Sequence, residues 1–280
     1  MECHSNVFDA AVTPVVIGLT NDCVRNNSIS LFKLVEQDFY PQELSLTYSS
    51  IRKLENLSFS FEPNIQINIE TTPLGELASF CLGIKTADND RFVLDSKKGE
   101  DYYKILRGKD IDRYKINWAE KWIWYMPDLM MERNGAGPRK LEYFQDEKIL
   151  LRDVANKITA AYDNKNYLVL DTINFIHKPK KGISLKYLTA ILNSNFITFW
   201  FKRSFPAGLH IKNNQLKQLP IPKIHEKTQQ PFVTLIDQIL TAKQKDPNAD
   251  ISALEKQIDE MVYALYGLTD EEIAIVEGKG

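Results

Sequence analysis

Short apolar runs alternate with polar loops through the middle of the chain, at 73–225, as expected for a domain of mixed strands and helices. The clearest strand is the motif KWIWYMP, in which Trp122 and Trp124 alternate with two further large apolar residues. We expect these tryptophans to pack in a core, because large apolar side chains occupy both faces of such a strand.

Three later segments have the spacing of amphipathic helices. The first carries the motif ILNSNF, and its buried stripe is Leu185, Leu188, Ile191, Leu192 and Phe199. Two more lie on either side of Pro247, and their apolar faces comprise Phe232, Leu235, Ile236, Ile239, Leu240, Ile251, Leu254, Ile258, Met261 and Leu265. Gly267 ends the last of these, and Thr269 and Glu272 form a capping box for a final short helix. The pattern predicts an α+β fold followed by an antiparallel helical spacer.

Composition indicates a soluble globular chain, since 44% of the 280 residues are hydrophobic. No run approaches the roughly 18 apolar residues of a membrane span. The first residues, MECHSNVFDAAV, lack the basic and then apolar order of a signal peptide. We therefore expect a cytoplasmic protein with no membrane partner. Cys3, Cys23 and Cys81 are odd in number and far apart, so we expect neither a disulfide framework nor a structural metal site.

Charge is distributed unevenly along the chain, although the net charge is only −2. Residues 85–225 carry 26 lysines and arginines against 16 aspartates and glutamates, a net charge of +10. Residues 1–84 and residues 226–280 each carry a net charge of −6. A basic middle between acidic ends is typical of a surface that binds phosphates, because each neutralised phosphate releases condensed counterions. Ordinary solvated lysines are the alternative reading of the same block.

Several motifs of this chain occur in the same order as in a known protein family. After ILNSNF, the segment IKNNQLKQLPIPKI places Leu216, Leu219, Ile221 and Pro222 at the spacing L-x-x-L-x-I-P, and Gln229-Gln230 follow. Upstream lie PLGELASFCLGIKTADNDRFV, LRGKDIDRYKI and KILLRDVANKITAAYDNKNYLVLDTINFI. Together these segments resemble the TaqI-like C-terminal specificity, or target-recognition, domain of fused type II restriction-modification enzymes and adenine-N6 DNA methyltransferases. The same order is similar to that of type I specificity subunits.

The resemblance implies a division into three parts. Residues 1–72 would be a remnant of a methyltransferase edge, marked by the apolar run at 7–20, with a connector. Residues 73–225 would be the DNA target-recognition domain, with a twisted β-sheet and flanking helices, and residues 226–280 a C-terminal helical region. A part of this kind reads double-stranded DNA without catalysing a reaction. It positions the DNA for adenine-N6 methylation, and for cleavage as in type IIG restriction enzymes.

The partners implied are therefore double-stranded DNA and methyltransferase and endonuclease domains in the same or a partner chain. We expect no cofactor in this chain. S-adenosylmethionine and Mg²⁺ would belong to the catalytic domains of the full enzyme.

Candidate DNA contacts lie in loops rich in hydrogen-bond donors. The loop KTADND follows Gly83 at a point where the family approaches DNA, and the family also brings the segment around 152–157 towards DNA. The motif LRGKDIDRYKI gathers cations on one side, and RNGAGPRK reads as an exposed loop. The lysines beside Pro179 suit phosphates. His210 extends the basic surface. The candidate residues are Lys85, Thr86, Asn89, Arg91, Arg107, Lys109, Arg113, Arg133, Asn134, Arg139, Lys140, Arg152, Asn156, Lys157, Lys178, Lys180, Lys181, Lys202, Arg203 and Lys212.

Two other functions fit parts of the sequence. Asp128, Asp146 and Lys148 resemble the nuclease pattern P-D...D/E-x-K, whose carboxylates hold Mg²⁺ while the lysine assists an attacking water. The C-terminal helices could alternatively serve as a protein-interaction scaffold. The amino-methyltransferase motif N/D-P-P-Y/F and a complete G-x-G-x-x-G are both absent from the sequence, so we assign no catalytic residue and no metal ligand to this chain.

Overall fold

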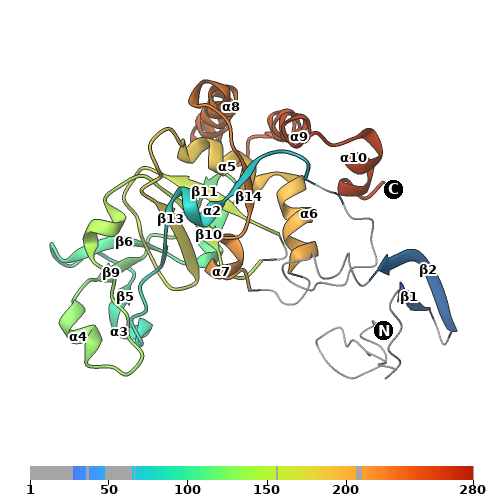
Figure 1. Cartoon of the computed structure of the whole chain (residues 1–280). Coiled ribbons are helices and arrows are strands. Elements are labelled where there is room, and N and C mark those ends of the chain that lie inside the picture. The colour runs from blue at the N-terminus through green and yellow to red at the C-terminus, as the bar shows by residue number, and fades with distance from the viewer. Residues whose placement is uncertain are drawn as a thin grey trace. The chain divides into compact units, whose positions relative to one another are not determined.

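The computed structural model describes residues 28–35, 38–47, 65, 67–155, 157–205 and 210–279. The chain divides into two compact units, which are Met1–Gln66 with Phe201–Gly208, and Ile67–Trp200 with Leu209–Gly280. The first unit contains an antiparallel hairpin of strands β1 (Ser28–Val35) and β2 (Asp38–Thr47). The apolar run predicted at 7–20 lies outside the described residues. The second unit carries the two four-stranded sheets (Figure 1).

The larger sheet of the second unit is antiparallel, with the strand order β11-β10-β13-β4. Its strands are β4 (Ser79–Leu82), β10 (Lys148–Arg152), β11 (Ala160–Asp163) and β13 (Ile173–His177). Every residue of β13 is buried, as are the first four of β10, because these central strands are covered on both faces. The three central residues of the motif KILLR therefore form a continuous apolar run rather than an alternating one.

The second sheet has the order β12-β6-β9-β5 and contains one parallel pair, β12 with β6. Its strands are β5 (Val93–Leu94), β6 (Tyr102–Leu106), β9 (Trp122–Trp124) and β12 (Leu168–Val169). Ile84 joins the two sheets, because its N–H donates to the Val169 carbonyl at 2.8 Å and its carbonyl accepts from the Asp171 N–H at 3.0 Å. The fold is thus α+β, as the sequence pattern predicts.

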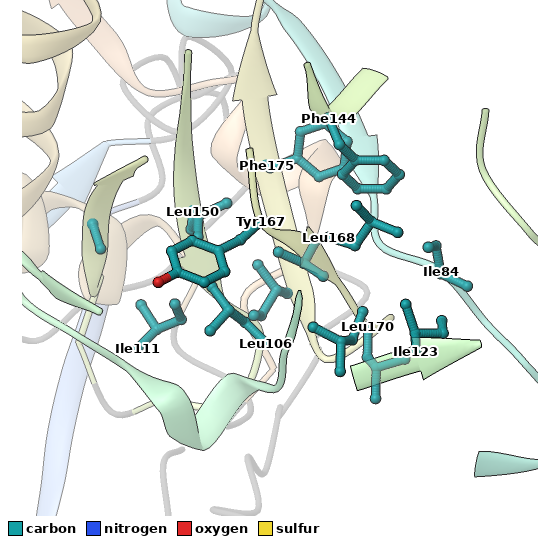
Figure 2. Close-up of a cluster of buried hydrophobic side chains, with 14 of the residues drawn as sticks. Ile84, Leu106, Ile111, Ile123, Phe144, Leu150, Tyr167, Leu168, Leu170 and Phe175 are labelled. Carbon is teal, nitrogen blue, oxygen red and sulfur yellow. The ribbon is translucent and has the colours of Figure 1, made fainter. Parts of the chain in front are cut away.

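One apolar core serves both sheets (Figure 2). Ile123, Leu106 and Leu170 approach it from the second sheet and its adjoining turn, and Leu150 and Phe175 from the larger one. The tryptophans of β9 are half-buried. Trp124 packs against this core and stacks on Tyr102, while Trp122 meets Trp118 edge to face with ring centroids 5.3 Å apart. The expected core packing is therefore seen for Trp124, whereas Trp122 lies at the margin.

Short elements connect the strands of the second unit. They are β3 (Thr71–Pro73), α2 (Leu74–Leu77), α3 (Asn89–Phe92), η1 (Gly108–Asp110), β7 (Ile111–Asp112), β8 (Lys115–Ile116), α4 (Pro127–Met131), η2 (Leu141–Phe144), α7 (Asn213–Leu216) and β14 (Pro220–Pro222). β3 and β14 pair with each other, and the Leu74 N–H donates to the Leu219 carbonyl at 2.9 Å. The exit motif LPIP therefore lies beside the start of the recognition domain predicted at 73–225.

The longer helices are α5 (Leu185–Asn193), α6 (Asn195–Ser204), α8 (Glu226–Lys245), α9 (Ser252–Tyr266) and α10 (Asp270–Val276). Leu185, Leu188, Ile191 and Leu192 are buried as predicted, while Phe199 is half-buried. Gly267 ends α9 in the left-handed conformation at φ 71°, and Thr269 with Glu272 forms the predicted capping box of α10. Within the described residues, no helix is both long and apolar enough to cross a membrane.

Asn193, the first of the two asparagines in ILNSNF, has a structural role. Its side chain is buried and meets the peptide edge of Ala160 with two hydrogen bonds of 2.9 Å, one accepted from the Ala160 N–H and one donated to the Ala160 carbonyl. The amide thus takes the place of a neighbouring strand at the end of β11. The Ala160 N–H is satisfied in this way, which avoids the cost of leaving it unpaired, and the Ala160 carbonyl gains a donor in addition to the Tyr114 N–H.

Gln229 performs the same task at the other end of α5. Its buried amide accepts from the Ser184 N–H at 2.9 Å and donates to the Gly182 carbonyl at 2.7 Å. Together with the contact between the rings of Tyr187 and Phe232, this pins α8 against α5. The glutamine of the C-terminal helix therefore fixes where that helix packs.

Asp259 docks α9 onto the start of α6. Its carboxylate accepts from the backbone N–H and from the side-chain amide of Asn195, both at 2.8 Å. Burial raises the pKa of this carboxyl to about 6, against the lowering effects of the Asn195 hydrogen bond and of nearby Arg113. The docking contact is therefore sensitive to mildly acidic pH.

Replacing Asn193 by Asp should destabilise the second unit. The carboxylate cannot donate to the Ala160 carbonyl and brings an uncompensated charge into a buried position, which costs about 2–4 kcal/mol. Urea unfolding followed by circular dichroism measures the loss. Asn214→Asp is the matched control at an exposed position, and an equal loss in both variants would contradict the proposed role of the amide.

The wild-type chain should lose stability between about pH 4 and about pH 6 through Asp259. The native carboxyl retains its proton up to about pH 6, whereas the unfolded one releases it near pH 3.9, so rising pH favours the unfolded state by on the order of 2 kcal/mol. Asp259→Asn removes this contribution. Urea unfolding at several pH values should therefore show a difference between variant and wild type that grows in favour of the variant as pH rises. A constant difference would contradict the titration.

Candidate nucleic-acid interface

The antiparallel register gathers several candidate segments at one end of the larger sheet. Leu82 of β4 pairs with Asn174, Arg152 of β10 pairs with Ile173, and Leu151 pairs with Ala160. The chain leaves β4 and β10 at this end, and it enters β11 and β13 there. We call it the loop end of the sheet.

Thr172 and Asp153 tie three loops together at the loop end. The Gly108 N–H donates to the Thr172 hydroxyl at 2.9 Å, and the Asp153 N–H donates to the Thr172 carbonyl at 3.1 Å. The Ile211 N–H donates in turn to the Asp153 carbonyl at 2.7 Å. Segments that lie far apart in sequence, around 107–109, 152–157 and 210–212, therefore converge.

Each of these loops presents a cation. Lys109, Lys157 and Lys212 are exposed, Arg152 is half-buried, and none of the four pairs with a carboxylate in the described part of the chain. Cations without an internal partner are available to phosphates. Asn156, predicted between Arg152 and Lys157, lies outside the described residues.

Two further candidate loops lie side by side next to the loop end. Lys85 and Gly137 exchange backbone hydrogen bonds of 3.2 and 2.7 Å, and the Arg133 guanidinium lies 3.0 Å from the Asp88 carboxylate. Arg139 donates from Nε to the Leu82 carbonyl at 3.1 Å. The loops 85–91 and 133–140, predicted separately, thus form one surface. Its exposed candidates are Lys85, Asn89, Arg91, Arg133, Asn134 and Lys140.

Other predicted contacts are engaged within the protein. Thr86 is buried, and its hydroxyl donates to the Asn89 side chain at 2.6 Å and accepts from the Asp88 N–H at 3.1 Å. Arg107 lies 3.2 Å from the buried Asp110 carboxylate and caps η1. These side chains shape loops of the interface, and their hydrogen-bonding groups are already in use.

Arg113 is also held internally. It donates from Nη2 to the Asn193 carbonyl and lies 3.2 Å from the Glu255 carboxylate of α9. Its neighbour Tyr114 is buried, and the Tyr114 N–H donates to the Ala160 carbonyl at 2.9 Å. The β7–β8 turn is therefore bound to both residues of the Asn193–Ala160 contact, through Arg113 at Asn193 and through Tyr114 at Ala160. Arg113 also connects this turn with α9.

The lysines that follow β13 do not join the loop end. Lys178, Lys180 and Lys181 follow His177 at the opposite end of β13, where the Lys180 N–H donates to the Leu77 carbonyl at 2.7 Å. The length of this five-residue strand, roughly 17 Å at about 3.4 Å per residue, separates them from the loop end. Lys202 and Arg203 lie in the last turn of α6.

Asp153, Thr172 and Asn174 were missed by reasoning from the sequence. Asn174 is buried and donates to the Ile211 carbonyl at 3.1 Å and to the Asp153 carboxylate at 3.5 Å. A search for cations and flexible loops passes over neutral and acidic residues. The only available signal was polar residues at the two ends of otherwise apolar strands.

The nuclease pattern is not assembled in a usable form. Lys148 is fully buried, lies 2.7 Å from the Asp163 carboxylate, and donates to the Phe144 carbonyl at 2.9 Å. Burial lowers the pKa of Lys148, opposed by the charge and hydrogen bond of Asp163. Asp128 and Asp146 are exposed. In the described ranges, no group of three or more His, Cys, Asp or Glu side chains is arranged to hold a metal ion.

Residues 103–221 match the family of TaqI-like C-terminal specificity domains. No curated protein matches the chain. Among solved structures, a type IIL restriction-modification enzyme, MmeI, determined in complex with DNA, is similar with 12% identity over 92% of this chain and 41% of MmeI, at a TM-score of 0.52.

Two further solved structures are similar at lower TM-scores. The HsdS subunit from Thermoanaerobacter tengcongensis has 14% identity over 73% of this chain and 46% of its own, at a TM-score of 0.37. The type IIG restriction endonuclease BpuSI has 13% identity over 70% of this chain and 31% of its own, at a TM-score of 0.41. The chain therefore spans less than half the length of each of these three proteins.

The family match contains β10, β11 and β13, the ILNSNF helix, all of β6 except Tyr102 and all of the LPIP exit motif except Pro222. It also contains the 107–109, 152–157 and 210–212 segments that converge at the loop end. Residues 103–221, which include the converging loops, are therefore similar to the TaqI-like C-terminal specificity domains.

Proposed function

We propose that this chain recognises a specific sequence in double-stranded DNA and positions that DNA for adenine-N6 methylation, and for cleavage, by domains outside this chain. The observation that carries the proposal is the convergence of Lys109, Arg152, Lys157 and Lys212, all without carboxylate partners in the described chain, on the loop end of a specificity domain. The adjoining loops at 85–91 and 133–140 widen the same basic surface.

This arrangement suits a duplex because its two kinds of contact are separate. Lysines on exposed loops hold phosphates wherever they lie, whereas base edges are read by groups held in one orientation. The hydrogen bonds of Thr172, Asp153 and Asn174 fix three loops relative to a rigid sheet. The loops therefore enter a groove in a defined arrangement, which sequence reading requires.

The chemistry belongs to partner domains in this proposal. S-adenosylmethionine would bind to a methyltransferase domain, which extrudes the target adenine from the duplex, and Mg²⁺ would serve an endonuclease domain. These domains would lie in the same or a partner chain, and the protein would act in the cytoplasm. The internal commitment of Lys148 to Asp163 argues against a nuclease centre at Asp128 and Asp146.

Selection of a randomised duplex library on the full chain, with excess nonspecific competitor, should enrich one short motif. Enrichment is expected because the loops are held in one arrangement at the loop end, so their side chains meet base edges in a fixed register. Sequencing of the bound fraction after several rounds is the measurement. Binding without any enriched motif would contradict sequence recognition and leave only electrostatic binding.

Triple replacement of Lys109, Lys157 and Lys212 by Ala should weaken binding to all duplexes and lower the slope of log affinity against log salt by about 3, since each lost phosphate contact removes about 0.9. Fluorescence anisotropy at four salt concentrations measures this. The matched control is the triple Ala variant at Lys178, Lys180 and Lys181, on the opposite end of the sheet. We expect its slope to fall by less than about 1. Equal reductions in both variants would contradict placement of the duplex at the loop end.

A further inference from the structure

We propose that Val154 and His210 form a base-reading pair, in which Val154 contacts the 5-methyl group of a thymine and His210 hydrogen-bonds the edge of an adjacent base. This inference rests on the proposed function and names two of the residues that would carry its specificity. It follows from the backbone pairing at the loop end, from the exposure of one apolar side chain there, and from the hydrogen bond that orients the imidazole.

The two side chains stand on the same face of an isolated antiparallel bridge. Val154 and His210 are directly opposite each other in this bridge. Residues so paired point to the same side, with their Cβ atoms about 4.5–5.5 Å apart. Ile211 follows and is buried, whereas Lys212 after it is exposed. The bridge therefore presents Val154 and His210 together, with the exposed Lys212 two residues further along the chain.

Val154 is an unusual residue to expose at this position. Its exposure is 42%, and within the described residues only Met131 is another large apolar side chain classed as exposed. It lies between the cations of the loop end, and an apolar side chain has no group that can bind a phosphate. Apolar side chains in the major groove distinguish thymine by contact with its methyl group, which no other DNA base carries at that position.

His210 is held in one orientation although its side chain is 64% exposed. Its Nδ1 lies 3.0 Å from the Asp153 carboxylate. Asp153 is itself fixed, because its backbone bonds to Thr172 and Ile211, and Asn174 donates to its carboxylate. With Nδ1 occupied, Nε2 is the ring nitrogen free to contact a ligand. A preoriented donor or acceptor on a rigid sheet end is what base reading requires.

The neighbouring cations and this pair have different roles in the proposed complex. Lys157 and Lys212 flank it on the same two loops and are exposed without carboxylate partners in the described chain. Flexible ammonium groups hold phosphates on either side, while the short, fixed side chains between them face the bases. The pair is therefore placed for specificity and the lysines for affinity.

The first test compares the motifs selected from a randomised duplex library by the full-length wild type, Val154→Ala, His210→Ala and the control Lys212→Ala. We expect Val154→Ala to relax one T·A position and His210→Ala to relax a neighbouring position. Lys212→Ala should keep the motif and bind every duplex more weakly. All three positions are on exposed side chains, so the variants should fold, which circular dichroism checks.

The second test removes the methyl group from the DNA. Uracil in place of the thymine at the relaxed position should weaken wild-type binding by about fourfold, the value of one buried methyl group, and should leave Val154→Ala binding unchanged. Additive losses in the variant and the modified DNA would overturn the contact.

The outcomes separate this inference from the proposed function. A wild-type motif that persists unaltered in Val154→Ala and His210→Ala would overturn the pair and leave sequence recognition intact. Absence of any wild-type motif would overturn sequence recognition and the pair with it.

Discussion

The strand register of the larger sheet is the constraint on which the rest of the structure depends. Leu82 opposite Asn174, and Arg152 opposite Ile173, bring the loop after β4, the loop between β10 and β11, and the loop before β13 to one end. A slip of β13 by one residue would move each of its side chains to the opposite face of the sheet, where it would not fit the existing packing, and would separate Thr172 from Asp153. The burial of these strands therefore fixes the arrangement of the loops, even though no loop residue contributes to the sheet itself.

Buried amides make this arrangement compatible with a compact domain. Strand and helix ends leave peptide groups without partners, and such groups are costly in an interior. Asn193 and Gln229 meet those groups with paired hydrogen bonds, and the buried Asn174 side chain donates to one such group, the Ile211 carbonyl, among the loops. Polar residues that resemble recognition groups in the sequence thus include several whose role is to hold the scaffold.

Much of the fold, and part of the interface, could be predicted from the sequence. Local chemistry determines the Thr269 capping box and the end of α9 at Gly267. The fate of a cation is decided elsewhere: Arg113 pairs with Glu255, more than a hundred residues away, whereas Lys109 pairs with no carboxylate described. Lys178 and Lys85 read alike as loop cations, and only the strand directions place them at different ends of the sheet. The end of the sheet at which a loop cation lies depends on tertiary pairing, and the spacing of residues in the sequence does not contain that information.

The ladder between β3 and β14 brings residues 71–73 and 220–222 together, so the chain enters and leaves the recognition region at one place. A segment whose two ends meet in this way is a closed unit that can be exchanged as a cassette, because a replacement needs only to match one pair of short strands. Under the proposed function, exchange of the segment between these two points would replace the DNA-reading loops as one piece. New specificities would then arise by exchange of a whole module as well as by point substitution.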